Sequence, residues 1–226
     1  MKIIKVKDYQ ELSSLAAEII GKQIKSKPTS ILGLATGSTP VGTYKKLIEM
    51  KVDFSKVKTF NLDEYCGLEG THPQSYVHFM KENLFNHVNI KSGNFNFPSG
   101  KNCNKYDAMI TKAGGIDLQL LGIGSNGHIG FNEPDTVFHN LTRVVKLAKS
   151  TIKDNARFFD NIKDVPKTAV SMGIGTIMAA RKIILVADSN KAAIMKQLEN
   201  QVVSPQLPAS ILHFHPDCTV IFVATS

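Results

Sequence analysis

Short apolar, β-branched runs alternate with longer amphipathic stretches along this chain. The runs typical of buried strands occupy residues 3–6, 30–35, 57–62, 117–122, 182–187 and 218–223. Amphipathic stretches that predict helices follow Asp8, which precedes Glu11 as in a capping box, and occupy residues 41–50, 73–86, 106–113 and 190–199. This alternation predicts an α/β protein with a doubly wound, mostly parallel, Rossmann-like sheet and helices on both faces. Ligands of such sheets bind beyond the carboxyl ends of the strands.

Length and patterning predict a single domain over residues 1–226. A chain of 226 residues with 42% hydrophobic content suits one large α/β core. Two regions interrupt the alternation. Residues 91–104 are rich in Gly, Asn and Ser and indicate a surface loop, whereas residues 148–167 carry a short amphipathic helix between polar turns. We interpret the second region as a small helical lid.

The formal charge of +8 is compatible with nucleic acid, an anionic membrane surface or an acidic small molecule. The lysines of residues 2–27 are interleaved with apolar residues, and no aromatic-rich basic cluster accompanies them, which favours solvated surfaces over a nucleic-acid partner. No apolar run approaches the length of a membrane span, and the N-terminus is too polar for a signal peptide. We expect a soluble cytoplasmic protein.

Three cysteines, Cys66, Cys103 and Cys218, lie far apart and lack paired spacing. Neither a disulfide framework nor a metal site is indicated, and a reducing compartment is favoured.

Small and hydroxyl-bearing residues join the strand at 30–35 to the following helix, namely Thr36, Gly37, Ser38 and Thr39 before Pro40. The N–H groups and positive dipole end of a helix start, together with these hydroxyls, make an anion site suited to phosphate. The segment lacks the lysine of a Walker loop and the glycines of a dinucleotide fingerprint, so a phosphorylated small molecule fits better than ATP or NAD. An ordinary N-cap by Thr39, with Pro40 at the first helical position, explains the same residues equally well.

Two acidic residues, Asp63 and Glu64, directly follow an apolar strand. Because adjacent residues at a strand end point in different directions, one carboxylate can face the ligand crevice while the other caps or pairs structurally. Asp63 is our candidate for the reactive group. The residues alone favour the alternative that both acids are loop residues marking the end of the strand.

A glycine-rich connection after the strand at 117–122 carries a histidine and a carboxylate. Glu133 is close enough in sequence to orient His128, which lies among Gly122, Gly124, Gly127 and Gly130. A histidine with a nearby acid is common equipment for moving protons at neutral pH. A single histidine is usually structural, but four glycines beside this polar side chain favour a functional site. Arg157 and Lys191 remain cations of solvated helix faces unless they share a site with the phosphate turn.

Six ordered motifs resemble the short form of the glucosamine-6-phosphate deaminase (isomerase) family. They are LGLATGSTPVGTYKKL, FNLDEYCGL with HPQSYVHFM, GGIDLQLLGIGSNGHIGFNEP, ARFF, AVSMGIGTIMAARKIILVA and PASILHFHP. The likeness extends from about Ile31 nearly to the C-terminus.

The resemblance implies an aldose–ketose isomerisation coupled to loss of ammonia, without cofactor or metal. Glucosamine 6-phosphate would become fructose 6-phosphate, as in the catabolism of amino sugars. His128, tuned by Glu133, would assist opening of the sugar ring, and Asp63 would take a proton from C2 and return one at C1.

The same resemblance implies that the phosphate is bound by the turn from Thr36 to Thr39, with Arg157 reaching from the lid and Lys191 from a late helix. The implied partner is a small-molecule sugar phosphate, with no nucleic acid and no membrane; a homo-oligomer is compatible with the sequence. Asn126 stands where longer members carry an aspartate, and we interpret it as a hydrogen-bonding member of the catalytic set that carries no proton. Val145 replaces a lysine of the second sugar-phosphate site of longer members, so allosteric activation is not expected.

Two alternatives share this fold. A 6-phosphogluconolactonase-like hydrolase would use the histidine to activate water at a lactone, but the sequences DEY at 63–65 and FNEP at 131–134 favour the deaminase. A non-catalytic sugar-phosphate sensor would carry a DNA-binding segment, for which the chain has no spare length.

Overall fold

A parallel sheet forms the centre of the molecule. The computed structural model describes residues 1–200 and 202–224. Among these residues seven strands pair in the order β1-β10-β9-β6-β2-β3-β5, and every neighbouring pair is parallel. The strands are β1 (Lys2–Val6), β2 (Ile31–Leu34), β3 (Lys58–Asn61), β5 (Phe95–Asn96), β6 (Leu118–Leu121), β9 (Ile183–Ala187) and β10 (Cys218–Val223). The doubly wound sheet predicted from the sequence is confirmed.

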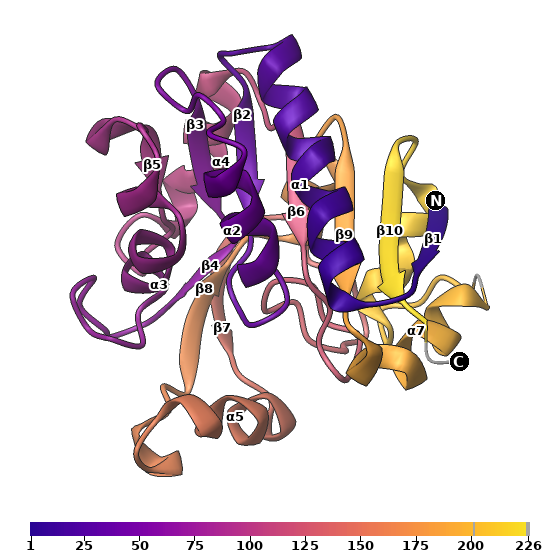
Figure 1. Ribbon diagram of the computed structural model, residues 1–226. Coiled ribbons are helices and arrows are strands. Elements are labelled where there is room, and N and C mark those ends of the chain that lie inside the picture. Colours follow the sequence, from indigo (N-terminus) through magenta and orange to yellow (C-terminus); the bar gives the residue numbers. More distant parts are fainter. Residues whose placement is uncertain (201, 225–226) are drawn as a thin grey trace.

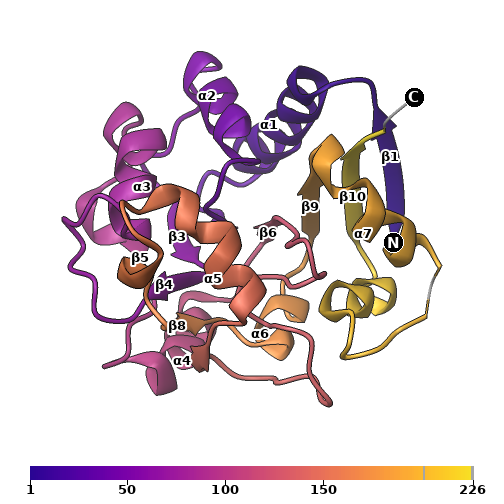
Figure 2. The ribbon, with the colours of Figure 1, turned by 90° about the horizontal axis from the view of Figure 1, so that it is seen from below.

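Helices cover both faces of the sheet. The helices α1 (Tyr9–Ser26) and α2 (Val41–Glu49) pack on one face, and α4 (Cys103–Ala113) and α6 (Ile174–Met178) lie on the other (Figure 2). Because both faces are covered, the central strands are buried and almost wholly apolar. Further helices are α3 (Tyr76–Asn83), α5 (Lys149–Asn155) and α7 (Ala192–Glu199). Within residues 1–200 and 202–224, none of the helices combines the length and the hydrophobicity needed to cross a membrane.

The first helix begins where the sequence predicts. The Asp8 carboxylate accepts a hydrogen bond of 2.8 Å from the backbone N–H of Glu11, and the Glu11 carboxylate accepts one of 2.9 Å from the N–H of Lys7. These contacts satisfy two backbone donors near the helix start. Leu12, Ile20 and their neighbours on the same face are buried in the core.

A small antiparallel sheet, which the sequence did not predict, extends from the carboxyl edge of the main sheet (Figure 1). Its strands β4 (Asp63–Tyr65), β8 (Thr168–Ser171) and β7 (Arg143–Lys146) pair in that order. The helix α5 and short 3-10 turns connect β7 to β8, so the segment 148–167 contains the short helix that we expected there. Tyr65 and Phe131 pack in a separate apolar cluster beside this sheet.

The region 91–104 is not simply a loop. It contains a 3-10 turn, Ser92–Asn94, the strand β5 and the start of α4. Asn96 donates a hydrogen bond of 2.9 Å to the carbonyl of Thr59 in β3. A strand of two residues has no hydrophobic period, so only its pairing with β3 reveals it. The helices near 73–86 and 190–199 are also shorter than expected, since α3 begins at Tyr76 and α7 at Ala192.

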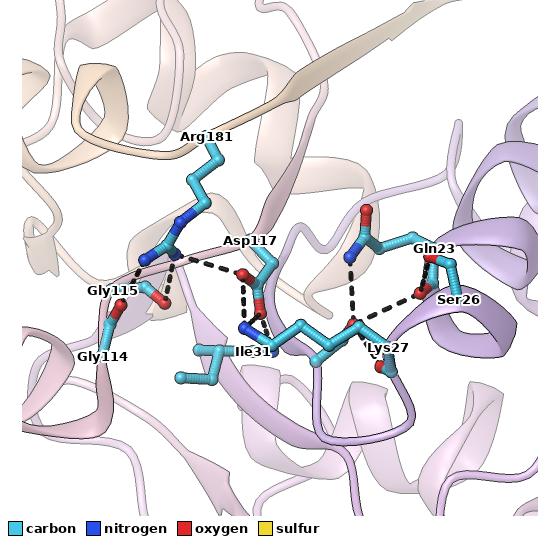
Figure 3. Close-up of polar contacts among 9 residues, drawn as sticks. Gln23, Ser26, Lys27, Ile31, Gly114, Gly115, Asp117 and Arg181 are labelled. Atoms are coloured by element: carbon cyan, nitrogen blue, oxygen red, sulfur yellow. Dashed lines mark hydrogen bonds and ion pairs between the residues drawn. The ribbon is translucent and has the colours of Figure 1, made fainter.

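An ion cluster around the buried Asp117 joins the amino ends of β2, β6 and β9 (Figure 3). Asp117 is 4% exposed and accepts hydrogen bonds of 2.8 Å from the N–H of Ile31 and from the ammonium group of Lys27. The guanidinium of Arg181 lies 3.1 Å from the same carboxylate and donates to the carbonyl of Gly114 at 2.8 Å. The cluster therefore stabilises the edge of the sheet opposite to the candidate active site.

Candidate active site

A cavity of about 560 Å³ lies beyond the carboxyl ends of β2, β3, β6 and β9. From β2 the chain continues to β3 on one side, whereas from β6 it continues, through the small sheet, to β9 on the other. Loops that leave neighbouring strands in opposite directions open a crevice between them, which is where ligands bind in doubly wound sheets. The loops after β2 and β6 form two walls of this cavity.

The turn after β2 lines the cavity with Thr36, Gly37, Ser38 and Thr39. Gly37 has a φ of +98°, a backbone conformation that strongly favours glycine. The position before α2 is occupied by Pro40, and no side chain caps this helix. The alternative that Thr39 is an ordinary N-cap is therefore wrong, and so is the placement of Pro40 at the first helical position. The hydroxyl of Thr39 does not cap the helix and so remains available to a ligand.

The adjacent acids Asp63 and Glu64 have different environments. This agrees with the expectation that one faces the cavity and the other has a structural role. Asp63 lines the cavity and is 7% exposed. Burial, with a further contribution from the charge of Glu64, raises the pKa of Asp63 to about 8. The Glu64 carboxylate points to the start of α3, where it accepts the N–H groups of Tyr76 at 2.9 Å and Val77 at 3.0 Å. Both acids belong to β4, so the alternative that they are loop residues is wrong.

His128 lines the same cavity from the connection after β6. A Cβ atom at Gly124 would lie 2.3 to 2.5 Å from the imidazole ring, so only glycine lets the backbone pass behind it. His128 Nδ1 lies 3.4 Å from Glu133 Oε2, an ion-pair distance. The two atoms are not aligned as a hydrogen bond, and Nδ1 is buried without a hydrogen-bond partner. The loop thus brings the predicted histidine and carboxylate together.

Glu133 and Asn126 lie behind His128 and are not part of the cavity wall. Asn126 donates a hydrogen bond of 2.7 Å to Glu133 Oε2 and accepts one of 3.2 Å from the N–H of His128. Burial raises the pKa of Glu133, but the nearby His128 and hydrogen bonds from Thr151 and Asn126 outweigh burial and lower it to about 2. Glu133 is therefore anionic, and an amide at position 126 can donate to it where an ionised aspartate would repel it.

Arg157 and Lys191 line the cavity together with the turn after β2. Arg157 lies in a 3-10 turn, Ala156–Phe158, and Lys191 ends another, Ser189–Lys191. Burial and the charge of Arg157 lower the pKa of Lys191, whereas Asp154 and Asp188 act in the opposite direction. Both cations share the cavity with the turn Thr36–Thr39, which is the arrangement under which we expected them to have a role beyond a solvated surface.

Several residues of the cavity were not found from the sequence. Lys153 and Asp154 of α5 line it, and Asp154 accepts a hydrogen bond of 2.7 Å from the hydroxyl of Ser125. Charged residues on a short, polar helix look like solvated surface, so no signal in the sequence marks them. In the part of the chain that the structure describes, no group of three or more His, Cys, Asp or Glu side chains is arranged to hold a metal ion.

The chain is similar to known proteins over almost its whole length. The family model of glucosamine-6-phosphate isomerases/6-phosphogluconolactonase matches residues 7–221. The chain belongs to this family. Within the family, it is 53% identical to a glucosamine-6-phosphate deaminase of Thermoanaerobacter pseudethanolicus, over 98% of this chain and 92% of the relative. It is 54% identical to a glucosamine-6-phosphate deaminase of Lachnoclostridium phytofermentans, over 98% of each chain.

Two solved structures share the fold of this chain. A structure described as a monomeric glucosamine-6-phosphate deaminase superposes on this chain with a TM-score of 0.96 at 42% identity. The match covers 99% of this chain and 97% of the solved chain. A 6-phosphogluconolactonase of Thermotoga maritima superposes with a TM-score of 0.78 at 22% identity, over 99% of both chains. At that identity the second likeness shows a common fold and no more.

Proposed function

We propose that this protein is a glucosamine-6-phosphate deaminase, which converts glucosamine 6-phosphate and water into fructose 6-phosphate and ammonia in the catabolism of amino sugars. One observation carries the proposal. A buried acid with a raised pKa, Asp63, faces the same cavity as His128 and a turn rich in hydroxyl groups. Relatives of this name at 53% and 54% identity support it.

The phosphate of the substrate binds at the turn after β2. The N–H groups at the start of α2 and the hydroxyls of Thr36, Ser38 and Thr39 surround this end of the cavity. Arg157 and Lys191 neutralise the remaining charge from the opposite side. Fixing the phosphate orients the sugar so that C1 and C2 lie toward Asp63 and His128.

Ring opening is assigned to His128. The imidazole carries a proton between the ring oxygen and the C1 hydroxyl, and the anionic Glu133 beside Nδ1 stabilises its charged form. Asn126 fixes this pair through its hydrogen bonds to both residues. The product of this step is the open-chain amino aldehyde.

Asp63 moves the proton between the two carbons. Its carboxylate removes the proton from C2 to form an enolamine, and the resulting acid returns a proton to C1. Water then adds to the imine carbon at C2, and ammonia leaves. A pKa of about 8 makes Asp63 a stronger base than an ordinary carboxylate, while enough of it is ionised near neutral pH to act. The segment 148–167 serves as a lid that keeps bulk water from the enolamine.

The test is to incubate the purified protein with glucosamine 6-phosphate, without added metal or nucleotide, and to follow ammonia and fructose 6-phosphate together. Stoichiometric release of both, reduced about 10²- to 10⁴-fold in Asp63→Asn, is expected. Hydrolysis of 6-phosphogluconolactone without release of ammonia would favour the lactonase. Binding of sugar phosphate without turnover of either compound would favour the sensor.

We infer a cytoplasmic location, because Cys66, Cys103 and Cys218 are all free thiols and sugar phosphates are intracellular metabolites. A solved relative described as monomeric suggests a monomer, although the sequence is also compatible with a homo-oligomer. Light scattering during size-exclusion chromatography distinguishes the two states.

A further inference from the structure

Thr151 belongs to α5 but its side chain contacts the candidate acid–base pair. Its Oγ1 donates a hydrogen bond of 2.5 Å to Glu133 Oε1, and the residue is 3% exposed. Ser150 and Lys153 on the same helix are exposed. The helix therefore turns this hydroxyl inward, away from solvent and onto the carboxylate.

The two oxygens of Glu133 have separate partners. Oε2 accepts from Asn126 at 2.7 Å and is the oxygen 3.4 Å from His128 Nδ1. Oε1 accepts from Thr151 and, at 3.4 Å, from the N–H of Ala148. Because a carboxylate is planar, any rotation that moves Oε2 away from His128 also breaks the bond between Oε1 and Thr151. Thr151 and Asn126 thus each hold one oxygen of the carboxylate, and together they fix the direction in which it faces.

We propose that Thr151 is a positioning residue that holds Glu133 toward His128, so that the acid–base pair is fully assembled only while the segment 148–167 is docked. The inference rests on the proposed deaminase function, because ring opening is the step assigned to His128. Thr151 also lines the cavity, but its hydroxyl is directed to Glu133, and in this proposal it acts through that residue.

Other contacts dock the same helix without Thr151. Asn155 donates a hydrogen bond of 2.8 Å to the hydroxyl of Tyr65, and Ser125 donates one of 2.7 Å to Asp154. Removal of the Thr151 hydroxyl therefore leaves α5 attached to the body of the protein. The effect falls on Glu133, which keeps only the long contact with Ala148 at Oε1.

Three variants separate the hydroxyl from the shape of the side chain. Thr151→Val keeps the branched shape and removes the donor, Thr151→Ser keeps the donor, and Ser150→Ala removes an exposed hydroxyl from the adjacent residue. We expect Thr151→Val to lower kcat for ammonia release about 10- to 100-fold, the size of a lost hydrogen bond to a charged group, while KM changes less than about 3-fold. Thr151→Ser and Ser150→Ala are expected to stay within about 3-fold of the wild-type kcat.

Deuterium at C2 of glucosamine 6-phosphate locates the affected step. If ring opening slows, the isotope effect on kcat is no larger in Thr151→Val than in wild type. A larger isotope effect would place the loss at Asp63 and overturn the inference, as would wild-type kcat in Thr151→Val or an equal loss in Thr151→Ser. A wild-type protein that releases no ammonia would overturn the proposed function together with this inference. Unchanged thermal unfolding of each variant confirms that it folds.

Discussion

At the scale of single residues, one peptide bond separates two carboxylates with different chemistry. Asp63 is buried against the cavity, and no backbone donor contributes to its pKa. Glu64 accepts three backbone N–H groups, those of Tyr65, Tyr76 and Val77. Successive side chains of β4 point to opposite sides. Asp63 therefore faces the cavity, and Glu64 faces the start of α3.

Glu64→Gln is expected to lower the pKa of Asp63, because it removes the neighbouring like charge while burial still raises that pKa. The base form of Asp63 carries the reaction, so the rising limb of kcat/KM against pH should move to lower pH. The glutamine carbonyl can still accept N–H groups at the start of α3, so folding is retained. Glu69→Gln, at an exposed carboxylate nearby in the sequence, should leave the profile in place. A profile shifted upward in Glu64→Gln would contradict the assignment.

At the scale of elements, the segment 148–167 brings several charged and polar side chains to the cavity without belonging to the parallel sheet. It extends from the antiparallel pair of β7 and β8, and α5 holds it to the body through Asn155 and Asp154. Neither the antiparallel pairing nor the docking follows from local propensity. Arg157 reaches the cavity only because this segment folds back.

Arg157→Ala should chiefly raise the KM for glucosamine 6-phosphate, about 10-fold, because the cation binds phosphate equally in ground and transition states. We expect kcat to change far less. Lys163→Ala is the matched control, since it removes an exposed cation of the same segment that does not line the cavity. Steady-state kinetics of ammonia release measure both constants. An unchanged KM would show that Arg157 does not bind the substrate and is only a solvated surface cation.

At the scale of the whole molecule, the buried Asp117 cluster and the cavity lie at opposite edges of one sheet. Asp117→Ala leaves the N–H of Ile31 without its acceptor and separates two cations from their shared carboxylate. Lys27 and Arg181 are about half exposed, so water compensates in part. We expect the free energy of unfolding to fall by about 2 kcal/mol, with kcat nearly unchanged. Denaturant unfolding measures the loss, and Glu18→Ala, which breaks an exposed ion pair, should cost less than about 1 kcal/mol.

Asp63 also makes stability depend on pH. Its pKa rises from 3.8 to about 8 on folding, so the unfolded chain ionises first. The wild-type protein therefore loses stability as pH rises from about 4 to about 8, at up to about 1.4 kcal/mol per pH unit. Asp63→Asn lacks this loss, and its advantage in unfolding free energy over wild type should grow between pH 5 and pH 8. A difference between the two proteins that stays constant with pH would show that Asp63 keeps an ordinary pKa.

Much of the fold follows from short-range pattern. The strand β10 has the predicted bounds, and the helix α1 begins at the predicted cap, because apolar runs and capping residues act locally. The strands β4 and β5 were missed because their stability comes from remote partners. Asp63 pairs with Ser171, and Phe95 pairs with Thr59. No window of neighbouring residues contains those partners.

The candidate site also has some features that follow from local sequence and others that depend on remote residues. The sequence by itself determined the α/β alternation, the edge of the sheet at which the cavity lies and the glycine-rich loop that carries His128. These features depend on the period of apolar residues, on strand direction and on backbone freedom. Only the tertiary structure decided that burial raises the pKa of Asp63 to about 8, that Glu64 accepts N–H groups at the start of α3, and that Thr151 reaches Glu133. The physical reason is that burial and hydrogen bonding between distant residues, which shift pKa values and orient side chains, exist only after the chain has folded.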